Sequence, residues 1–376
     1  MVNFIVEYGM NLWLLVCLFM IGCVVGSFLN VGIARLPFEK SVIWPGSRCG
    51  NCFAPIRLID NIPLLSYWIL RGRCRHCKAK FSMRYFWVEL LVGVGFAGLF
   101  YLEVLRNIHQ MPAFRDAHWH LKMYLFSRQN IPILVFFLHR AILFSLLVAA
   151  AFCDLQNRTI PISLTVFGAI VGLVFATACP WPWPNTVAEA MPTPRANFPV
   201  DEWWLLDATI QQKQGLYPWP VWGPPPQWAP AGSWRLGLLT GLAGALVGTF
   251  MLRGVKFLFE KGMGREALGL GDADLMMMVG AFLGWQVVVI AFLVGGLVSL
   301  ILALPKLVMG GSNELPFGPG LALGTVITWL TWSWIGPTVQ VMMFYPTILA
   351  IFVVGCAAVL LIMSFLMRFV RPAAEK

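Results

Sequence analysis

The stretch LMMMVGAFLGWQVVVIAFLVGGLVSLILALP, from Leu275 to Pro305, decides how often the chain crosses a membrane. As one helix it would be about 46 Å long, because an α-helix rises about 1.5 Å per residue, and the hydrocarbon core is only about 30 Å thick. We therefore predict two short spans, broken at Gly284-Trp285. Two spans keep the later basic residues on the same side as the earlier basic loop, whereas one span would move them across. Those residues are Lys306, Arg368, Arg371 and Lys376.

The composition agrees with a chain that lies mostly in lipid. Hydrophobic residues make up 59% of the 376 residues and charged residues only 12%, whereas soluble domains carry about 25% charge. This excludes a soluble globular protein, and for most of the chain it excludes intrinsic disorder. The fold class that we predict is an all-α polytopic membrane protein with about nine transmembrane helices. The net charge of +10 then indicates basic cytoplasmic loops and not nucleic-acid binding.

Apolar runs of about 20 residues set the spans. We place them at about 8–34, 85–102, 131–153, 160–179, 236–258, 275–283, 285–305, 318–335 and 345–367. Arg140 lies inside the third span, so we expect it to snorkel or to pair with an acid. The chain accordingly divides into a first span at 1–34, a loop at 35–84, three spans at 85–179, an insertion at 180–234, and the remaining spans at 235–376.

The segments between the spans differ in charge and composition. Residues 35–84 hold ten Lys or Arg against two acids, Glu39 and Asp60, which predicts a cytoplasmic loop and an external N-terminus. Residues 105–130 are basic although this topology places them outside; a helix lying on the anionic membrane surface would explain that. Residues 180–233 hold 12 of the 25 prolines, as in YPWPVWGPPPQWAP, so they cannot be helical throughout and indicate an external insertion.

Two cysteine pairs stand in the basic loop. Cys49-Gly-Asn-Cys52 and Cys74-Arg-His-Cys77 are separated by 21 residues (53–73), which is close to the spacing of four-cysteine zinc sites. Such a closed thiolate site is structural, and the metal would supply folding energy to a loop without a core. The alternatives are two unrelated reduced motifs or a disulfide, and a cytoplasmic location argues against the disulfide.

Two aspartates lie where apolar spans meet polar turns. Asp154 follows the third span in AAAFCDLQNRTIP, and Asp272 precedes the sixth in GLGDAD. The predicted topology puts both at the cytoplasmic ends of their helices, so they can meet at one depth. Each acid alone would more simply be a helix cap or a topology marker. Two carboxylates at one site cannot both ionise easily, and this is the basis of aspartyl proteolysis.

The helix ends predict a role for each acid. Asp154 lies at a helix C-terminus, where the dipole disfavours negative charge, and Asp272 at an N-terminus, where the dipole favours it. We therefore predict that Asp272 is the base and that Asp154 holds the proton. Asp274 is two residues on, which turns it about 200° away from Asp272 around a helix. We expect Asp274 to be solvated or paired and not part of the same site.

Several motifs together resemble the prepilin peptidase family, the type IV leader peptidases, which are membrane aspartyl proteases of the GxGD type. DLQNRTIP from Asp154 and GLGD ending at Asp272 are similar to the two catalytic aspartate motifs of that family. The other similar segments are GSFLNVGIARLP at 26–37, the double CxxC with NIPLLSYWILRGRCRHC, RYFWVELLVG, and LPFGPGLALG at 315–324. Two positions depart from the family pattern: Asp274 stands where a basic residue is usual, and Ile162 where an acid is usual.

The resemblance implies a multi-pass protein of the bacterial inner membrane. It implies cleavage of leaders from prepilins or pseudopilins at the cytoplasmic face, serving pili or type II secretion, by Asp154 and Asp272. It also implies S-adenosylmethionine-dependent methylation of the new N-terminus, an activity associated with the cysteine-containing loop. Glu89 could assist methyl transfer, although an interfacial acid is the simpler interpretation. The partners implied are the pilin-like substrates and membrane lipid, with no nucleic acid.

Two other function classes compete with the peptidase. A transporter or channel could use the two acids to relay protons, but it would place them nearer the bilayer midplane. A catalytically silent, zinc-stapled scaffold for secretion machinery would need neither acid. Loss of cleavage in Asp154→Asn and Asp272→Asn would distinguish the peptidase from both.

Overall fold

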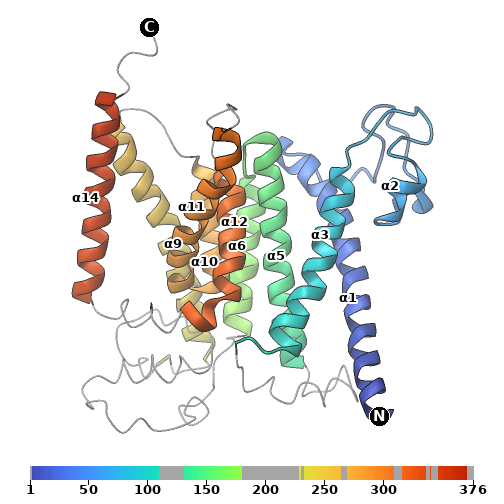
Figure 1. Ribbon diagram of the computed structural model, residues 1–376, viewed down its shortest axis with the longest axis horizontal. Helices are drawn as coiled ribbons and strands as arrows, with labels where there is room; N and C mark the ends of the chain where they lie inside the picture. The colour runs from blue at the N-terminus through green and yellow to red at the C-terminus, as the bar shows by residue number, and fades with distance from the viewer. Residues whose placement is uncertain are drawn as a thin grey trace. The chain divides into compact units, whose positions relative to one another are not determined.

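The computed structural model describes residues 2–109, 131–179, 228–229, 233–263, 269–308, 316–335, 339 and 346–370. Nine helices of at least 14 residues within these ranges correspond to the nine predicted spans, which confirms the predicted fold class (Figure 1). They are α1 (Val2–Arg35), α3 (Arg84–Leu99), α5 (Ile131–Asn157), α6 (Ile162–Ala178), α9 (Trp234–Met263), α10 (Leu270–Leu283), α11 (Trp285–Val308), α12 (Phe317–Leu330) and α14 (Pro346–Val370).

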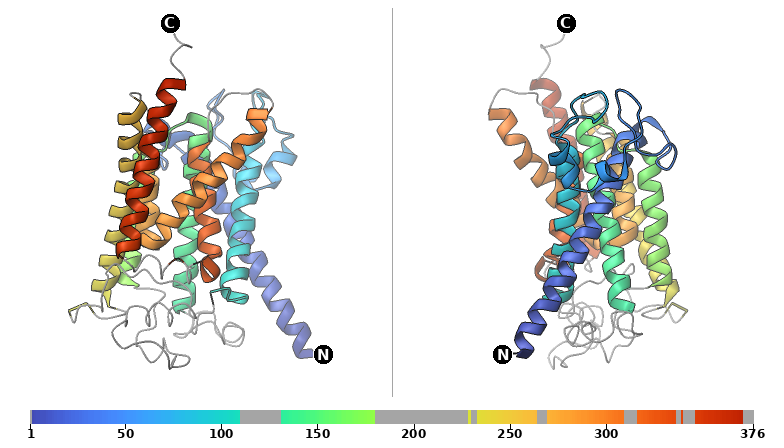
Figure 2. Two further views of the ribbon diagram at one scale, coloured as in Figure 1. Left: turned by 60° about the vertical axis from the view of Figure 1, so that its left-hand side comes forward. Right: turned by 90° about the vertical axis from the view of Figure 1, so that its right-hand side faces the viewer.

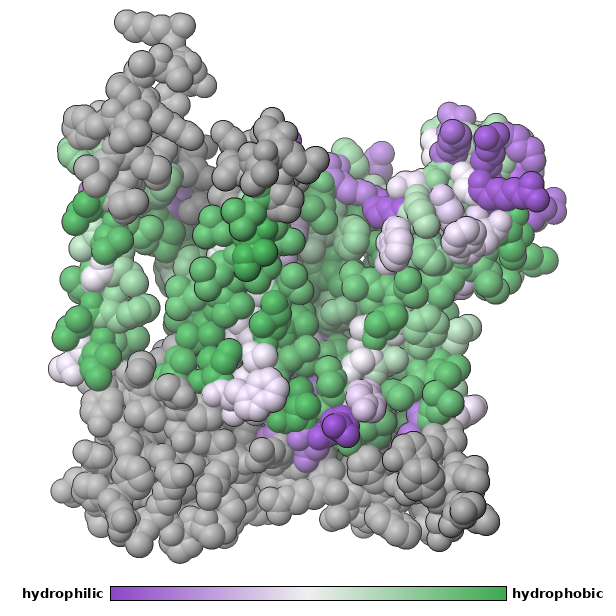
Figure 3. Space-filling view, viewed as in Figure 1, coloured by the Kyte–Doolittle hydropathy of each residue, from purple (hydrophilic) through white to green (hydrophobic). Residues whose placement is uncertain are grey.

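Length and composition suit these helices to a membrane. Five of those described are long and apolar enough to cross one by themselves, namely α1, α3 with its π-helical extension η3 (Phe100–Leu105), α5, α9 and α11. Three shorter apolar helices are α6, α12 and the middle part of α14. Figure 3 shows hydrophobic side chains over the helices, as a lipid-facing surface requires.

The chain forms two compact units. The first contains α1, the cysteine loop, α3, η3 and α5, and ends at Leu164; the second runs from Thr165 to Lys376 and contains most of α6 and all later helices. The predicted interfacial helix at 105–130 lies, from residue 110 on, outside the described residues. So does the predicted Pro- and Trp-rich insertion at 180–234, except for residues 228–229 and 233–234.

In the first unit, α1 and α3 lie side by side (Figure 2) and α5 packs on both. The buried side chain of Asn30 on α1 donates a hydrogen bond to the Tyr85 carbonyl on α3 at 3.0 Å. At the other end of α3, where η3 continues it, Arg140 of α5 lies 3.5 Å from Glu103 of η3, and both residues are buried. The expectation that Arg140 pairs with an acid is therefore confirmed, and polar contacts fix both ends of this helix group.

In the second unit, α10 crosses α9 at glycines. A side chain added at Gly280 would strike the carbonyl of Gly244, so both positions are limited to glycine by the close approach of the two backbones. Close backbone packing through small residues is the usual way in which helices associate in lipid. The helix α14 lies along α9 (Figure 2), and α12 packs on α11.

The opening stretch folds into two helices, as predicted. The helix α10 ends at Leu283 and α11 begins at Trp285. Gly284 between them has φ = 81°, a left-handed conformation that glycine adopts without strain, and its N–H donates to the Gly280 carbonyl at 2.8 Å. The break separates an N-terminal helix, which carries Asp272, from the longer apolar span that follows.

Candidate functional site

The four cysteines of the loop converge on one point. All four Sγ atoms lie within 4.8 Å of one another, with Cys49 and Cys77 at 3.7 Å and Cys52 and Cys74 at 4.0 Å. Zinc bound tetrahedrally at about 2.3 Å from each sulfur holds its ligands about 3.8 Å apart. The four thiols therefore fit a closed zinc site, which leaves no position for a water or a substrate.

Each CxxC pair is folded as a knuckle. The Cys49 N–H donates to the Ala54 carbonyl at 3.0 Å, and the Phe53 N–H donates back to the Cys49 carbonyl at 3.0 Å. The second knuckle repeats both bonds, at 2.9 and 3.0 Å, with Cys74, Ala79 and Lys78. The repeated turn explains how two short sequence motifs present four sulfurs to one point.

Backbone N–H groups also favour the metal-binding form of the thiols. The N–H groups of Cys52 and Asn51 lower the pKa of the Cys49 thiol, and the N–H of Ala79 lowers the pKa of Cys77. A thiol must lose its proton to bind a metal, so these hydrogen bonds favour metal binding at Cys49 and Cys77, whereas burial and the neighbouring thiols raise the pKa of Cys52 to about 11.

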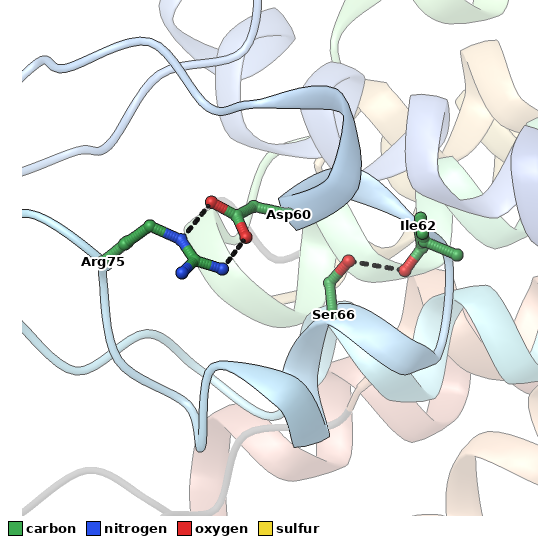
Figure 4. Close-up of polar contacts among 4 residues, drawn as sticks. All are labelled: Asp60, Ile62, Ser66 and Arg75. Carbon is green, nitrogen blue, oxygen red and sulfur yellow. Dashed lines mark hydrogen bonds and ion pairs between the residues drawn. The ribbon is translucent and has the colours of Figure 1, made fainter.

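A bidentate ion pair holds the linker between the knuckles. Asp60, buried in the short 3-10 helix η2 (Leu58–Asn61), accepts hydrogen bonds of 2.8 and 2.6 Å from the guanidinium of Arg75 (Figure 4). The Arg75 guanidinium holds the pKa of Asp60 below its usual range. Close by, the Ser66 hydroxyl donates to the Ile62 carbonyl at 2.5 Å, at the start of the short helix α2 (Leu65–Ile69) (Figure 4). The second knuckle is thus tied to the segment that leads into α2.

Glu89 anchors this loop to the membrane helices. Its carboxylate on α3 accepts the Leu64 N–H at 2.7 Å. Leu64 has φ = 63°, a backbone conformation that costs a leucine about 1–3 kcal/mol unless neighbours hold it. The structure therefore gives Glu89 a positioning contact with the loop, and the predicted alternative role in methyl transfer stays a prediction.

Asp154 lies in the last turn of α5. The chain leaves the helix at Arg158, whose φ is 54° and whose N–H donates to the Asp154 carbonyl at 2.8 Å. Pro161 then precedes α6 and accepts the Leu164 N–H at 3.0 Å. The sequence QNRTIP thus forms a tight connection that holds the half-buried Asp154 at the helix end, as the sequence predicted.

Asp272 lies in the first turn of α10. Gly269 precedes the helix in an extended conformation and has no side chain to cap it. The carboxylate of Asp272 is half-buried, and its place at the helix N-terminus agrees with the prediction. Asp154 belongs to the first unit and Asp272 to the second, so the meeting of the two carboxylates stays a prediction.

Asp274 makes an ion pair of its own. It is buried on α10, and its carboxylate lies 3.6 Å from the guanidinium of Arg253 on α9. The expectation that Asp274 is a paired acid is confirmed. The contact of Arg253 with Asp274 depends on how closely α9 and α10 pack, which the sequence does not give.

Comparison with known proteins identifies relatives along most of the chain. The bacterial peptidase A24 N-terminal domain matches residues 20–102. The prepilin leader peptidase/N-methyltransferase of Myxococcus xanthus is 31% identical over 293 residues, which cover 77% of this chain and 63% of that relative, less than two thirds of its length. The protein of that name from Aeromonas salmonicida is 27% identical over 84% of this chain and 89% of its own.

A third relative carries a different name. The type 4 prepilin-like proteins leader peptide-processing enzyme of Escherichia coli is 26% identical over 82% of this chain and 90% of its own length. No solved structure matches the chain. Over most of its length the chain is thus similar to the prepilin leader peptidases, and its residues 20–102 match the N-terminal domain of the bacterial A24 peptidases.

Proposed function

We propose that this protein is a membrane aspartic endopeptidase that removes leader peptides from type IV prepilins or pseudopilins at the cytoplasmic face of the bacterial inner membrane. The observation that carries the proposal is the similarity, over most of the chain, to relatives named prepilin leader peptidase/N-methyltransferase. The two aspartates support it, because each lies half-buried at a helix end. The ion pair with Arg253 gives Asp274 a role in packing α10 against α9.

The proposed chemistry uses Asp272 as base and Asp154 as acid. The Asp272 carboxylate takes a proton from a water molecule, whose oxygen attacks the carbonyl carbon of the scissile peptide bond. Protonated Asp154 donates to the carbonyl oxygen as the tetrahedral intermediate forms. The intermediate then collapses and the C–N bond breaks: one hydroxyl proton of the intermediate returns to Asp154, and Asp272 gives the proton that it took from water to the leaving amine nitrogen. The helix dipoles support this assignment of base and acid, because Asp272 lies at the N-terminus of α10, where negative charge is favoured, and Asp154 at the C-terminus of α5, where it is disfavoured.

We also propose that the protein methylates the amine that cleavage exposes. The relatives' names join the two activities, and the methyl donor would be S-adenosylmethionine, which passes its methyl group to the amine nitrogen while that nitrogen loses a proton. In this proposal Cys49, Cys52, Cys74 and Cys77 hold a structural zinc ion. The ion would contribute folding energy to the loop and take no part in either reaction.

A cleavage assay with the purified full-length protein tests the proposal. The substrate is a synthetic prepilin segment with a basic leader, a glycine before the cut and an apolar helix after it, and intact-mass measurement detects cleavage and methylation separately. Wild type should cleave, and Asp154→Asn and Asp272→Asn should each lose at least about 100-fold in rate. Cleavage that persists in both variants would contradict the aspartate assignment. A wild type that cleaves nothing would favour the transporter or the scaffold.

A further inference from the structure

The short helix α2 presents an unpartnered apolar face. Leu65, Trp68 and Ile69 follow the i, i+3, i+4 spacing that places side chains on one side of a helix. They are 57%, 61% and 55% exposed. Tyr67, on another side, packs edge-on against Phe81 with ring centroids 5.6 Å apart. One face of α2 therefore packs inside the loop, and another face, which is aliphatic and aromatic, is exposed.

Aromatic contacts fix the level of this face relative to α3. Trp68 packs edge-on against Phe86, with centroids 5.8 Å apart, and Phe86 in turn contacts Trp87 at 5.5 Å. Figure 1 shows α2 beside the first turns of α3. Rings of tryptophan and tyrosine gather where a membrane helix passes through the headgroup layer. The α2 face thus lies at the level where α3 enters the membrane.

The same face continues the outer surface of α3. Trp87, Leu91 and Val94 on α3 are 54%, 44% and 54% exposed, which in a membrane helix means contact with lipid. Figure 3 shows hydrophilic side chains gathered on the upper side of the loop and hydrophobic ones along its lower side, next to the helices. Continuity with the surface of α3 identifies lipid as the occupant of the α2 face.

The charges beside α2 suit an anionic surface. Arg71 and Arg73 follow the helix directly and are exposed. The loop has only two acids, and Asp60 is engaged by Arg75. Basic residues next to a membrane helix are attracted to anionic phospholipid within about one Debye length. Apolar and basic side chains thus stand together at the membrane surface.

We propose that Leu65, Trp68, Ile69, Arg71 and Arg73 form a lipid-docking foot that seats the cysteine loop on an anionic phospholipid leaflet. The three apolar side chains enter the boundary between headgroups and acyl chains, and the two guanidinium groups bind lipid phosphates. The foot acts with the Glu89 contact to hold the loop at a fixed height on α3. Its occupant is the bilayer in which α1 and α3 are embedded.

Hydrogen–deuterium exchange of the full-length protein in nanodiscs tests the foot. The amides of Leu70 and Gly72, which donate to the Ser66 and Tyr67 carbonyls, report on α2. Their exchange should slow when phosphatidylglycerol is added to phosphatidylcholine, and removing one arginine should reverse this by about fivefold. The Leu65→Ser/Ile69→Ser variant should exchange faster in both bilayers. Phe53→Asn, which removes an equally exposed apolar ring from a knuckle, should leave α2 unchanged. Equal exchange in the two bilayers and in detergent would overturn the proposal.

Photocrosslinking identifies the occupant directly. A photoreactive amino acid at position 69 should capture phospholipid in phosphatidylglycerol nanodiscs, whereas the same group at the exposed Asn51 should not. Unchanged cysteine-bound zinc in each variant shows that the loop is folded. Capture of a second polypeptide at position 69 in place of lipid would show that the face is a protein interface and would overturn the proposal.

Discussion

Asp274 of α10 lies 3.6 Å from Arg253 of α9, so the first turn of the helix that carries Asp272 is tied to its neighbour by charge. Asp272 is in the same turn but points about 200° away around the helix axis. The two acids of GLGDAD therefore have different surroundings. One takes part in packing α10 against α9, and the other lies half-buried at the N-terminus of α10.

We expect Asp274→Asn to cleave substrate within about tenfold of wild type, whereas Asp272→Asn should lose at least about 100-fold. The first change removes the carboxylate of an ion pair whose arginine is half-exposed, and the second removes the proposed base. Initial cleavage rates at saturating substrate measure both. Equal losses in the two variants would place Asp274 in the site and contradict the assignment.

A variant of Arg253, the partner of Asp274, tests the ion pair through its effect on stability. Arg253→Gln should destabilise the protein more than Asp274→Asn, by about 2–3 kcal/mol against about 1 kcal/mol, because it leaves a buried carboxylate without its cation. Thermal unfolding in detergent gives the order. A double variant no less stable than Arg253→Gln alone is the expected result, and additive losses would show that the two residues do not interact.

Zinc should be bound at one ion per chain and should hold the loop in shape. Cys74→Ser should lose the metal and expose the backbone of residues 47–80 to exchange, because structural zinc contributes about 10–16 kcal/mol to such small folds. Cys356→Ser, at an exposed free cysteine of α14, is the matched control and should keep the metal. Elemental analysis and hydrogen exchange give the two readouts. Full zinc content in Cys74→Ser would refute the four-cysteine site.

The contribution of the Asp60–Arg75 pair to the stability of the loop should not change with pH near neutrality. Arg75 lowers the pKa of Asp60, so its stabilising effect is fully present above the unfolded pKa of about 3.9 and is lost only as pH falls through the lower folded pKa. Asp60→Asn should therefore speed proteolysis of the loop equally at pH 5, 6 and 8. Arg75→Lys, which keeps the charge but loses the bidentate geometry, should speed it less. A difference that shrinks between pH 8 and 5 would contradict this assignment.

The helices could be predicted because the bilayer dictates them. Apolar length and the sidedness of the basic residues set nine segments, and the excess length of 275–305 with a glycine inside it predicted the break that Gly284 makes. The cysteine spacing likewise predicted one four-sulfur site, since the knuckle turn is local in sequence. Features that depend on residues close together in the sequence could thus be predicted.

Contacts between distant helices could not be read in the same way. The sequence required a partner for Arg140 but could not identify Glu103, because the second span was expected to end at Leu102 and the chain continues in helical form through Leu105. The partner of Asn30 on α1 is likewise not evident from the sequence, because it is the backbone carbonyl of Tyr85 on α3. Such partners depend on helix rotation and crossing, which composition does not determine.

Glu89 should act through the loop and not through its charge alone. Glu89→Gln keeps an oxygen that can accept the Leu64 N–H, whereas Glu89→Leu does not and should cost about 1–3 kcal/mol. Limited proteolysis between the knuckles and α3 should therefore be faster in Glu89→Leu than in Glu89→Gln. Equal protection in both variants would remove the positioning role. Loss of methylation in Glu89→Gln with an intact loop would instead support the role in methyl transfer.

The Arg140–Glu103 pair allows a test of how a charge is kept inside a membrane helix bundle. Both residues are 1% exposed, their charged groups lie 3.5 Å apart, and the Arg140 guanidinium also lies 5.1 Å from the centre of the Phe136 ring. Removing one residue leaves the other charge buried without this ion pair, so Arg140→Leu and Glu103→Leu should each cost about 3–5 kcal/mol. The double variant should recover part of that loss, because no buried charge remains. Thermal unfolding of the four proteins measures the coupling, and strictly additive losses would show that each charge is satisfied by other groups.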